Sequence, residues 1–205
     1  MLSDSLKGIV VLPQFQRGYS WGKKHVEDFW RDISDFQKES SVKGGRDAHF
    51  LGPIVVMRND SERDTTHILD GQQRLATATI LFSVLRDLAY GLQTTESKSF
   101  GDDVQNHLIT KEDYGYCLRM GVLDRDYFQE TIQSYPSNPR KPNIKSHRNI
   151  LKARELLLTS VRATLPSDRA LALKTLSSLR LIVSVSQESY QVDGVPGSSH
   201  LGTGG

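Results

Sequence analysis

The sequence predicts an α+β fold, in which a small sheet with its helices precedes a mainly helical segment. Three observations carry this prediction. Short β-branched runs alternate with helical periodicity before residue 90, one strand leads directly into a long amphipathic helix, and helical patterns dominate afterwards. We therefore expect a sheet domain over residues 1–90, a helical extension over 91–190 and a glycine-rich, disordered tail over 191–205.

The first 90 residues contain the clearest patterns. A β-branched run predicts a strand at 9–12, and spaced apolar residues predict a helix over 23–38. Two further strands are expected at 51–57 and 65–69, and a long helix follows over 72–90. One face of this last helix consists of Leu75, Ala78, Leu81, Phe82, Leu85 and Leu88.

The second half is predicted to be mostly helical. Its patterns indicate a loop at 94–103, a short strand at 114–120 and helices at 124–133 and 146–165. A short helix at 167–176 and a strand at 179–185 are expected after them. Asp124 and Asp126 are interpreted as helix-capping and surface charges. Trp30 and Leu81 are expected in the core, and Cys117 is interpreted as a small buried hydrophobe.

The composition restricts the classes of function. The chain has 205 residues, and 26 Lys and Arg against 24 Asp and Glu leave a net charge of +2, so nucleic-acid contact needs a local basic patch. The single cysteine excludes an internal disulfide and a thiolate zinc cluster, and the six scattered histidines lack metal-site spacing. No apolar run approaches the roughly 18 residues of a membrane helix, and the N-terminus lacks a signal-peptide core. A soluble, cytoplasmic protein is expected.

The segment DGQQR marks the predicted junction of a strand with the long helix. Asp70 is a good N-cap, and Gln73 stands where a capping-box partner belongs, so capping alone explains these two residues. It does not explain Arg74, because a cation in the first turn opposes the helix dipole by about 0.3–1 kcal/mol. Helix N–H groups, the small Gly71 and an arginine together indicate a phosphate site.

A second loop, LPQFQRGYSW, follows the first predicted strand. Its aromatic residues Phe15, Tyr19 and Trp21 either pack under the next helix or stack on a base, and Arg17 is a candidate for a second phosphate contact. Ligands of α/β units bind at the carboxyl ends of strands, so this loop and the DGQQR segment are expected to act together.

The sequence has a likeness to a known family, which is carried by four segments in order: LPQFQRGYSW, EDFWRDI, HFLGPIVV and HILDGQQRLATATILFSVLRD. They resemble the N-terminal domain of GmrSD-type, modification-dependent restriction systems, a family related to the ParB/sulfiredoxin-like fold. This resemblance implies a small mixed sheet and a role in phage defence. It extends more faintly through 124–133 and KSHRNILKARELL.

The resemblance also implies a nucleoside triphosphate (NTP) bound with Mg²⁺, with or without hydrolysis, so that an active form would be a nucleoside triphosphatase. The positions that correspond to the catalytic part of the motif are Asp70, Gln73 and Arg74, and Asp70 is also the candidate metal ligand. The positions implied in nucleotide binding are Gln16, Arg17, Tyr19, Gly71 and Gln72.

The likeness stops near Tyr190, and the final QVDGVPGSSHLGTGG has no counterpart, which indicates a C-terminally truncated member. The family's F-E-x-L-N-x-R-G segment and HNH nuclease domain are then missing, so the chain is not expected to cut DNA alone. It would regulate an HNH-type nuclease domain or subunit in trans. The alternatives are a non-catalytic DNA- or partner-binding module and an inactive remnant.

A basic run either contacts DNA phosphates or forms a solvated helix face, and it includes Arg140, Lys141, Lys145 and Arg148.

Overall fold

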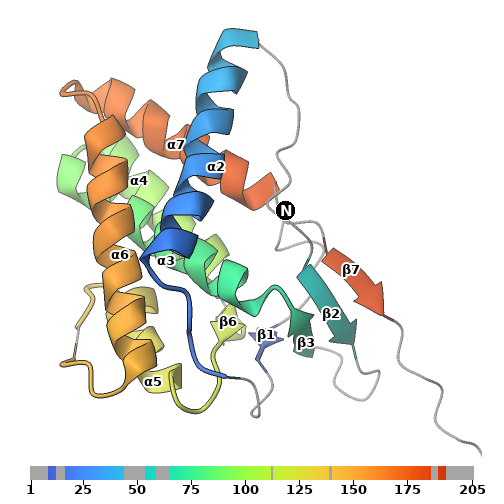
Figure 1. The fold of residues 1–205 in the computed structure, drawn as a ribbon. Coiled ribbons are helices and arrows are strands. Elements are labelled where there is room, and N and C mark those ends of the chain that lie inside the picture. Colours follow the sequence, from blue (N-terminus) through green and yellow to red (C-terminus); the bar gives the residue numbers. More distant parts are fainter. Residues whose placement is uncertain are drawn as a thin grey trace, which may run out of the picture.

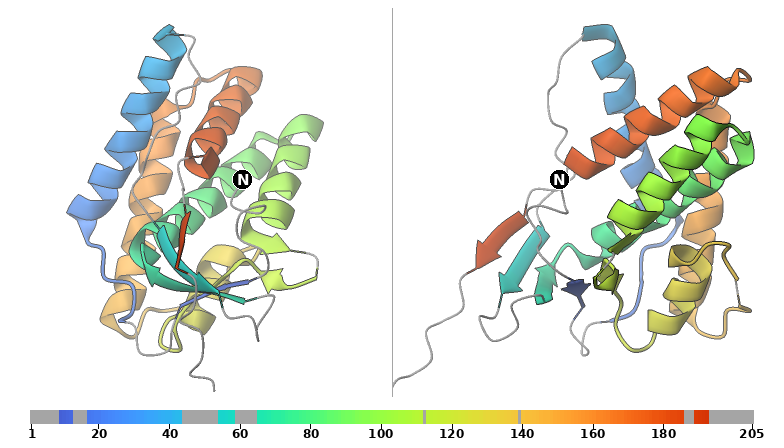
Figure 2. Two further views of the ribbon diagram at one scale, coloured as in Figure 1. Left: turned by 90° about the vertical axis from the view of Figure 1, so that its right-hand side faces the viewer. Right: turned by 180° about the vertical axis from the view of Figure 1, so that it is seen from behind.

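The fold is α+β, as the sequence predicts. In the computed structural model, a small mixed sheet lies at one end of the molecule and long helices gather beside it (Figures 1 and 2). The structure describes residues 9–12, 17–43, 54–58, 65–111, 113–138, 140–185 and 189–192.

The helices and strands follow one another in an order that interleaves both kinds of element. They are β1 (Ile9–Val11), α2 (Lys23–Lys43), β2 (Ile54–Arg58), β3 (Thr65–Asp70), α3 (Gln72–Leu92), α4 (Thr95–Asp103), the π-helix η1 (Val104–Ile109), β4 (Thr110–Lys111), β5 (Gly115–Tyr116), β6 (Leu118–Arg119), α5 (Arg125–Phe128), the π-helix η2 (Gln129–Gln133), α6 (Lys145–Thr164), α7 (Arg169–Val185) and β7 (Ser189–Val192).

The main sheet has five strands in the order β6-β1-β3-β2-β7. Strand β1 runs parallel to both of its neighbours, so that Val10 pairs with Thr66 of β3 and with Leu118 of β6. Strand β2 is antiparallel to β3, and β7 is parallel to β2. The carboxyl ends of β1, β3 and β6 therefore meet at one edge, and the segments that follow these strands come together there.

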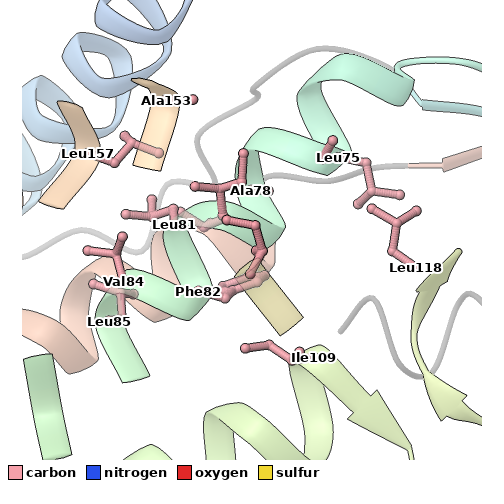
Figure 3. Packing of buried hydrophobic residues seen from close by; sticks show 14 of the residues in the cluster. Leu75, Ala78, Leu81, Phe82, Val84, Leu85, Ile109, Leu118, Ala153 and Leu157 are labelled. Carbon is pink, nitrogen blue, oxygen red and sulfur yellow. The ribbon is translucent and has the colours of Figure 1, made fainter. Parts of the chain in front are cut away.

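Helix α3 is the centre of the core. Leu81, Phe82 and Leu85 on this helix are at most 2% exposed, and Figure 3 shows Leu81 on the side of Leu157 of α6 and Phe82 on the side of Ile109 of η1. Within the described chain, α3 is also apolar and long enough to cross a membrane by composition alone, but 72% of its most apolar window is buried. Its position in the core accounts for its composition.

The core confirms one of the two predicted buried residues. Leu81 is fully buried, but Trp30 is only half-buried, because Phe29 and Ile33 take the inward positions on α2. Cys117 is likewise half-buried rather than enclosed.

Several predicted elements are confirmed within a few residues. These are the strands at 9–12 and 65–69 and the helices at 23–38, 72–90, 124–133 and 146–165. The strand predicted at 51–57 is confirmed from Ile54 onward as β2, and residues 51–53 lie outside the described residues. The predicted strand at 114–120 is two short strands, β5 and β6, which belong to different sheets.

The predicted loop at 94–103 is wrong, because these residues form helix α4. Thr94 caps this helix: its hydroxyl accepts from Ser97 N at 3.1 Å, and the Ser97 hydroxyl accepts from Thr94 N at 3.1 Å. This reciprocal capping box begins the helix in a polar sequence, and Phe100 is its buried anchor.

The predicted strand at 179–185 is also wrong, because α7 continues to Val185. Leu179, Ile182 and Val183 are buried at helical spacing. The predicted disordered tail is wrong at its start, since Gln191 and Val192 pair with β2 as part of β7. Residues 193–205 lie outside the described residues.

Candidate functional site

The candidate site lies at the edge where β1, β3 and β6 end. The segment 17–22 follows β1, the turn at 71–74 follows β3, and the segment 121–124 follows β6. Both arginine-bearing motifs of the sequence therefore reach the same edge of the sheet, as expected for strands that run in parallel.

Gly71 makes the turn from β3 into α3. Its φ of 89° lies in the left-handed region, which glycine adopts without steric cost. Gly71 occupies the N-cap position, and no side chain of the described residues makes a capping hydrogen bond there. The predicted capping by Asp70 and Gln73 is therefore wrong: Asp70 is the exposed last residue of β3, and the Gln73 side chain bonds elsewhere.

Gln73 joins the two motifs. Its side chain is 8% exposed, its Oε1 accepts a hydrogen bond from Ser20 N at 2.8 Å, and its Nε2 donates to Gly18 O at 3.5 Å. Both ends of the amide thus hold the loop 17–22 against the start of α3. In this arrangement Gln73 positions the loop that carries Arg17.

Tyr19 holds the same loop against α3 through its buried side chain. Its ring is 1% exposed, and its hydroxyl shares a 2.8 Å hydrogen bond with Thr77 of α3. Burial raises the pKa of the Tyr19 phenol, although the hydrogen bond to Thr77 lowers it in part. The side chain of Tyr19 therefore packs in the core and does not face a ligand, so the nucleotide contact expected of it does not follow from this geometry.

Asp124 is a positioning residue that sequence reasoning missed. Asp124 is 1% exposed, and its carboxylate accepts from Tyr19 N at 2.7 Å and from the Ser146 hydroxyl. Asp124 occupies the N-cap position of α5, as interpreted from the sequence, but its side chain makes no capping bond there. Its two hydrogen bonds connect the loop 17–22 to α6.

The start of α6 completes the support of this loop. Asn149 donates from Nδ2 to Tyr19 O at 3.4 Å. His147 is 8% exposed, stacks on Tyr127 with ring centres 4.0 Å apart, and places Nε2 3.0 Å from Leu123 O. The only signal for these residues in the sequence is the fainter family likeness of the segment KSHRN.

Four predicted site residues lie at the edge with accessible surface. Arg17 and Asp70 are exposed, and Gln72 and Arg74 are half-buried. Gln16 lies outside the described residues. Polar and charged groups of both signs therefore lie beside the first turn of α3, where helix N–H groups favour an anion.

The acidic residues fit one mode of metal binding. No group of three or more His, Cys, Asp or Glu side chains within the described ranges can hold a metal ion by itself. Mg²⁺ commonly binds through one or two carboxylates together with substrate phosphates and water. The exposed Asp70 suits that mode, as a single carboxylate beside the first turn of α3.

Of the four basic residues predicted to contact DNA, one forms an ion pair and three are exposed side chains at and before the start of α6. Arg140 forms an ion pair with Glu130. Lys141, Lys145 and Arg148 are exposed, and the last two lie on α6.

The fold and this edge define an α+β domain in which two arginine-bearing loops are held together at the ends of parallel strands. The sequence matches the family of the GmrSD restriction endonuclease, N-terminal domain, over residues 1–192, and the chain belongs to this family. The family gives the domain a context in DNA restriction and phage defence. Comparison with curated proteins finds no match.

Proposed function

We propose that this domain binds a nucleoside triphosphate with Mg²⁺ at the edge formed by 17–22, 70–74 and 121–124, and thereby regulates DNA cleavage. The cleavage itself would be carried out by an HNH-type nuclease domain or subunit. The observation that carries the proposal is the Gln73 amide, which holds the Arg17 loop against the start of α3, two residues after Gly71. The cytoplasm, where NTP and invading DNA meet, is the proposed location.

The chemistry of this edge suits a polyphosphate. The N-terminus of a long helix carries a partial positive charge, and its first N–H groups are available to phosphate oxygens. Gly71 lacks a side chain that would keep a phosphate away from this turn. Arg17 and Arg74 supply guanidinium groups that suit bidentate phosphate contacts. Mg²⁺ bound with the nucleotide would neutralise phosphate charge.

Hydrolysis needs additional positioning. In this proposal the exposed Asp70 carboxylate binds the metal or orients an attacking water, Arg74 stabilises developing phosphate charge, and Gln73 keeps the Arg17 loop in place. Gln72 contributes a further amide at the same turn. Its buried Oε1 accepts no hydrogen bond within the described structure, so it is an acceptor that a ligand can satisfy.

Calorimetric titration with ATP, GTP and CTP in the presence of Mg²⁺ tests this function. We expect saturable binding of at least one nucleotide, and we expect Arg17→Gln and Arg74→Gln each to weaken it strongly. Arg31→Gln is the matched control, because Arg31 is an exposed arginine of α2 that pairs with Asp28 one turn away.

Two results would contradict the proposal. One is no binding of any of the three nucleotides by folded protein. The other is binding that Arg31→Gln weakens as much as Arg17→Gln and Arg74→Gln do, because that would indicate nonspecific attraction to positive charge.

A further inference from the structure

A groove between α2 and α6 lies outside the site at the strand ends. The two helices run side by side (Figure 1), and the groove between them has a volume of about 610 Å³. Val26 and Ala153 are buried beneath it, and Leu156 adds to its apolar lining. This volume is in the range of small-molecule and nucleotide pockets.

Trp21 forms a flat aromatic wall of the groove. Its indole is half-buried, stacks on His25 with ring centres 5.8 Å apart and 17° between planes, and meets Phe29 edge-on at 6.1 Å. These two rings fix the indole plane, while part of it remains accessible in the groove. A fixed, accessible indole is a suitable surface for stacking a nucleobase.

A row of cations on α6 leads to this wall. Lys145, Arg148 and Lys152 follow one another at spacings of three and four residues, which places them on one face of the helix. All three are exposed, and Lys152 lines the groove. The row extends over about 10 Å at 1.5 Å per residue. No salt bridge within the described part of the chain engages these three side chains.

Acidic residues lie farther along the same groove. Glu27 pairs with Lys23 at 3.6 Å on α2, and Glu155 lies one turn beyond Lys152 on α6. The positive charge is therefore concentrated at the end of the groove beside Trp21 and the start of α6. A single anionic group needs only one of these cations, whereas a row of three matches the repeated phosphates of a strand.

We propose that this groove binds an unpaired stretch of DNA, with one base stacked on Trp21 and successive phosphates along Lys145, Arg148 and Lys152. The proposal rests on the DNA partner of the proposed function, but it does not require nucleotide binding at the strand ends. Asn149 links the two places, because it lines the groove and donates to the backbone of Tyr19 in the Arg17 loop.

Fluorescence anisotropy with a labelled single-stranded DNA 12-mer, measured over a range of salt concentrations, tests the proposal. Trp21→Leu should weaken binding by roughly 5- to 150-fold, which is the effect of losing one base stack. Lys152→Gln and Arg148→Gln should each reduce the slope of log affinity against log salt by about 0.7, as expected for one phosphate contact to a single strand. Lys174→Gln, at an exposed position on α7, is the control and should change neither quantity.

Two further ligands distinguish the alternatives. Duplex DNA of the same sequence should bind at least tenfold more weakly than the single strand, because its bases cannot reach the indole. AMP should bind far more weakly than the 12-mer, because it presents one phosphate. Equal affinity for duplex and single strand, or AMP binding as tight as that of the 12-mer, overturns the proposal.

Absence of binding, or binding that Trp21→Leu leaves unchanged in a folded variant, also overturns the proposal. If Trp21→Leu does not fold, Lys152→Gln and Arg148→Gln decide alone. A slope of log affinity against log salt that neither variant changes then refutes DNA binding in this groove. Arg74→Gln should retain DNA binding while losing nucleotide binding, so failure of this proposal and failure of the nucleotide site are distinguishable.

Discussion

Replacing Gly18 with alanine tests the packing that holds the Arg17 loop in place. A Cβ atom at this position would lie 2.8 Å from Asp124 Oδ2 and 3.1 Å from Ser146 Cβ. The carboxylate cannot move away easily, because Asp124 is 1% exposed and its carboxylate accepts from both Tyr19 N and the Ser146 hydroxyl. Gly18→Ala should therefore displace Asp124 and lengthen its 2.7 Å bond to Tyr19 N.

The expected loss of stability follows from two overlapping effects. Overpacking a well-filled site costs about 1–3 kcal/mol, and a hydrogen bond to a charged acceptor contributes about 1.5–3 kcal/mol. Both describe the same displacement, so they do not add, and we expect a loss of about 2–3 kcal/mol. Gly22→Ala is the matched control: no atom lies within 4 Å of its Cβ position, and the change should stay within about 0.5 kcal/mol.

Urea denaturation followed by far-ultraviolet circular dichroism measures both variants. Neither glycine has a positive φ among the described residues, so alanine fits the backbone at both positions and the comparison reports packing alone. If Gly18→Ala unfolds within about 0.5 kcal/mol of Gly22→Ala, the contact between the loop and Asp124 is not as we describe it.

The remaining predictions concern the turn, the core and the cysteine. Gly71→Ala should cost about 1–2 kcal/mol because its φ is 89°, whereas Gly91→Ala, with open space in the same helix, should stabilise by up to about 1 kcal/mol. Urea denaturation should show changes of opposite sign in the free energy of unfolding, and changes of the same sign would contradict the left-handed turn at Gly71. Leu81→Ala should cost about 2–5 kcal/mol and exceed Trp30→Ala, since Leu81 is fully buried and Trp30 is not; a thermal melt that ranks them the other way would contradict the core. Burial raises the pKa of the Cys117 thiol to about 11, although a nearby lysine lowers it in part, so alkylation of the folded protein should be slow at pH 8 and accelerate up to about pH 11. Because this folded pKa lies above that of the unfolded chain, burial of the thiol stabilises the protein at neutral pH, and the contribution is lost as pH rises from about 9 towards about 11. Alkylation at pH 8 that is as fast in the folded protein as in urea would contradict it.

The sequence predicts those parts of the site that depend on local chain geometry. Gly71 stands where β3 must turn sharply into α3. The Arg17 loop follows β1, which runs parallel to β3. Short apolar patterns and the family motif locate both. The same local reasoning fails for the role of Gln73, because an amide three residues after Asp70, a good N-cap residue, also suits a capping box.

Residues that support the loop from a distance could not be predicted. Asp124 and Tyr19 are 105 positions apart, and Asn149 and Tyr19 are 130 apart. Their meeting depends on how α5 and α6 pack against α3, which no short window of sequence contains. The 179–185 segment shows a related limit, since a short apolar, β-branched run suits a buried strand and a buried helix equally well.

Hydrogen exchange of the backbone amides, with and without nucleotide, tests most directly whether the two arginine-bearing loops form one site. Without nucleotide, the amides of Tyr19 and Ser20 should be protected although they lie outside helices and strands, because Asp124 and Gln73 accept from them. With Mg²⁺ and the nucleotide that binds, exchange should slow in 17–22 and 71–75 together, while α7 stays unchanged. Exchange that slows in only one of these two segments, or in neither with ATP, GTP or CTP, would contradict a shared nucleotide site.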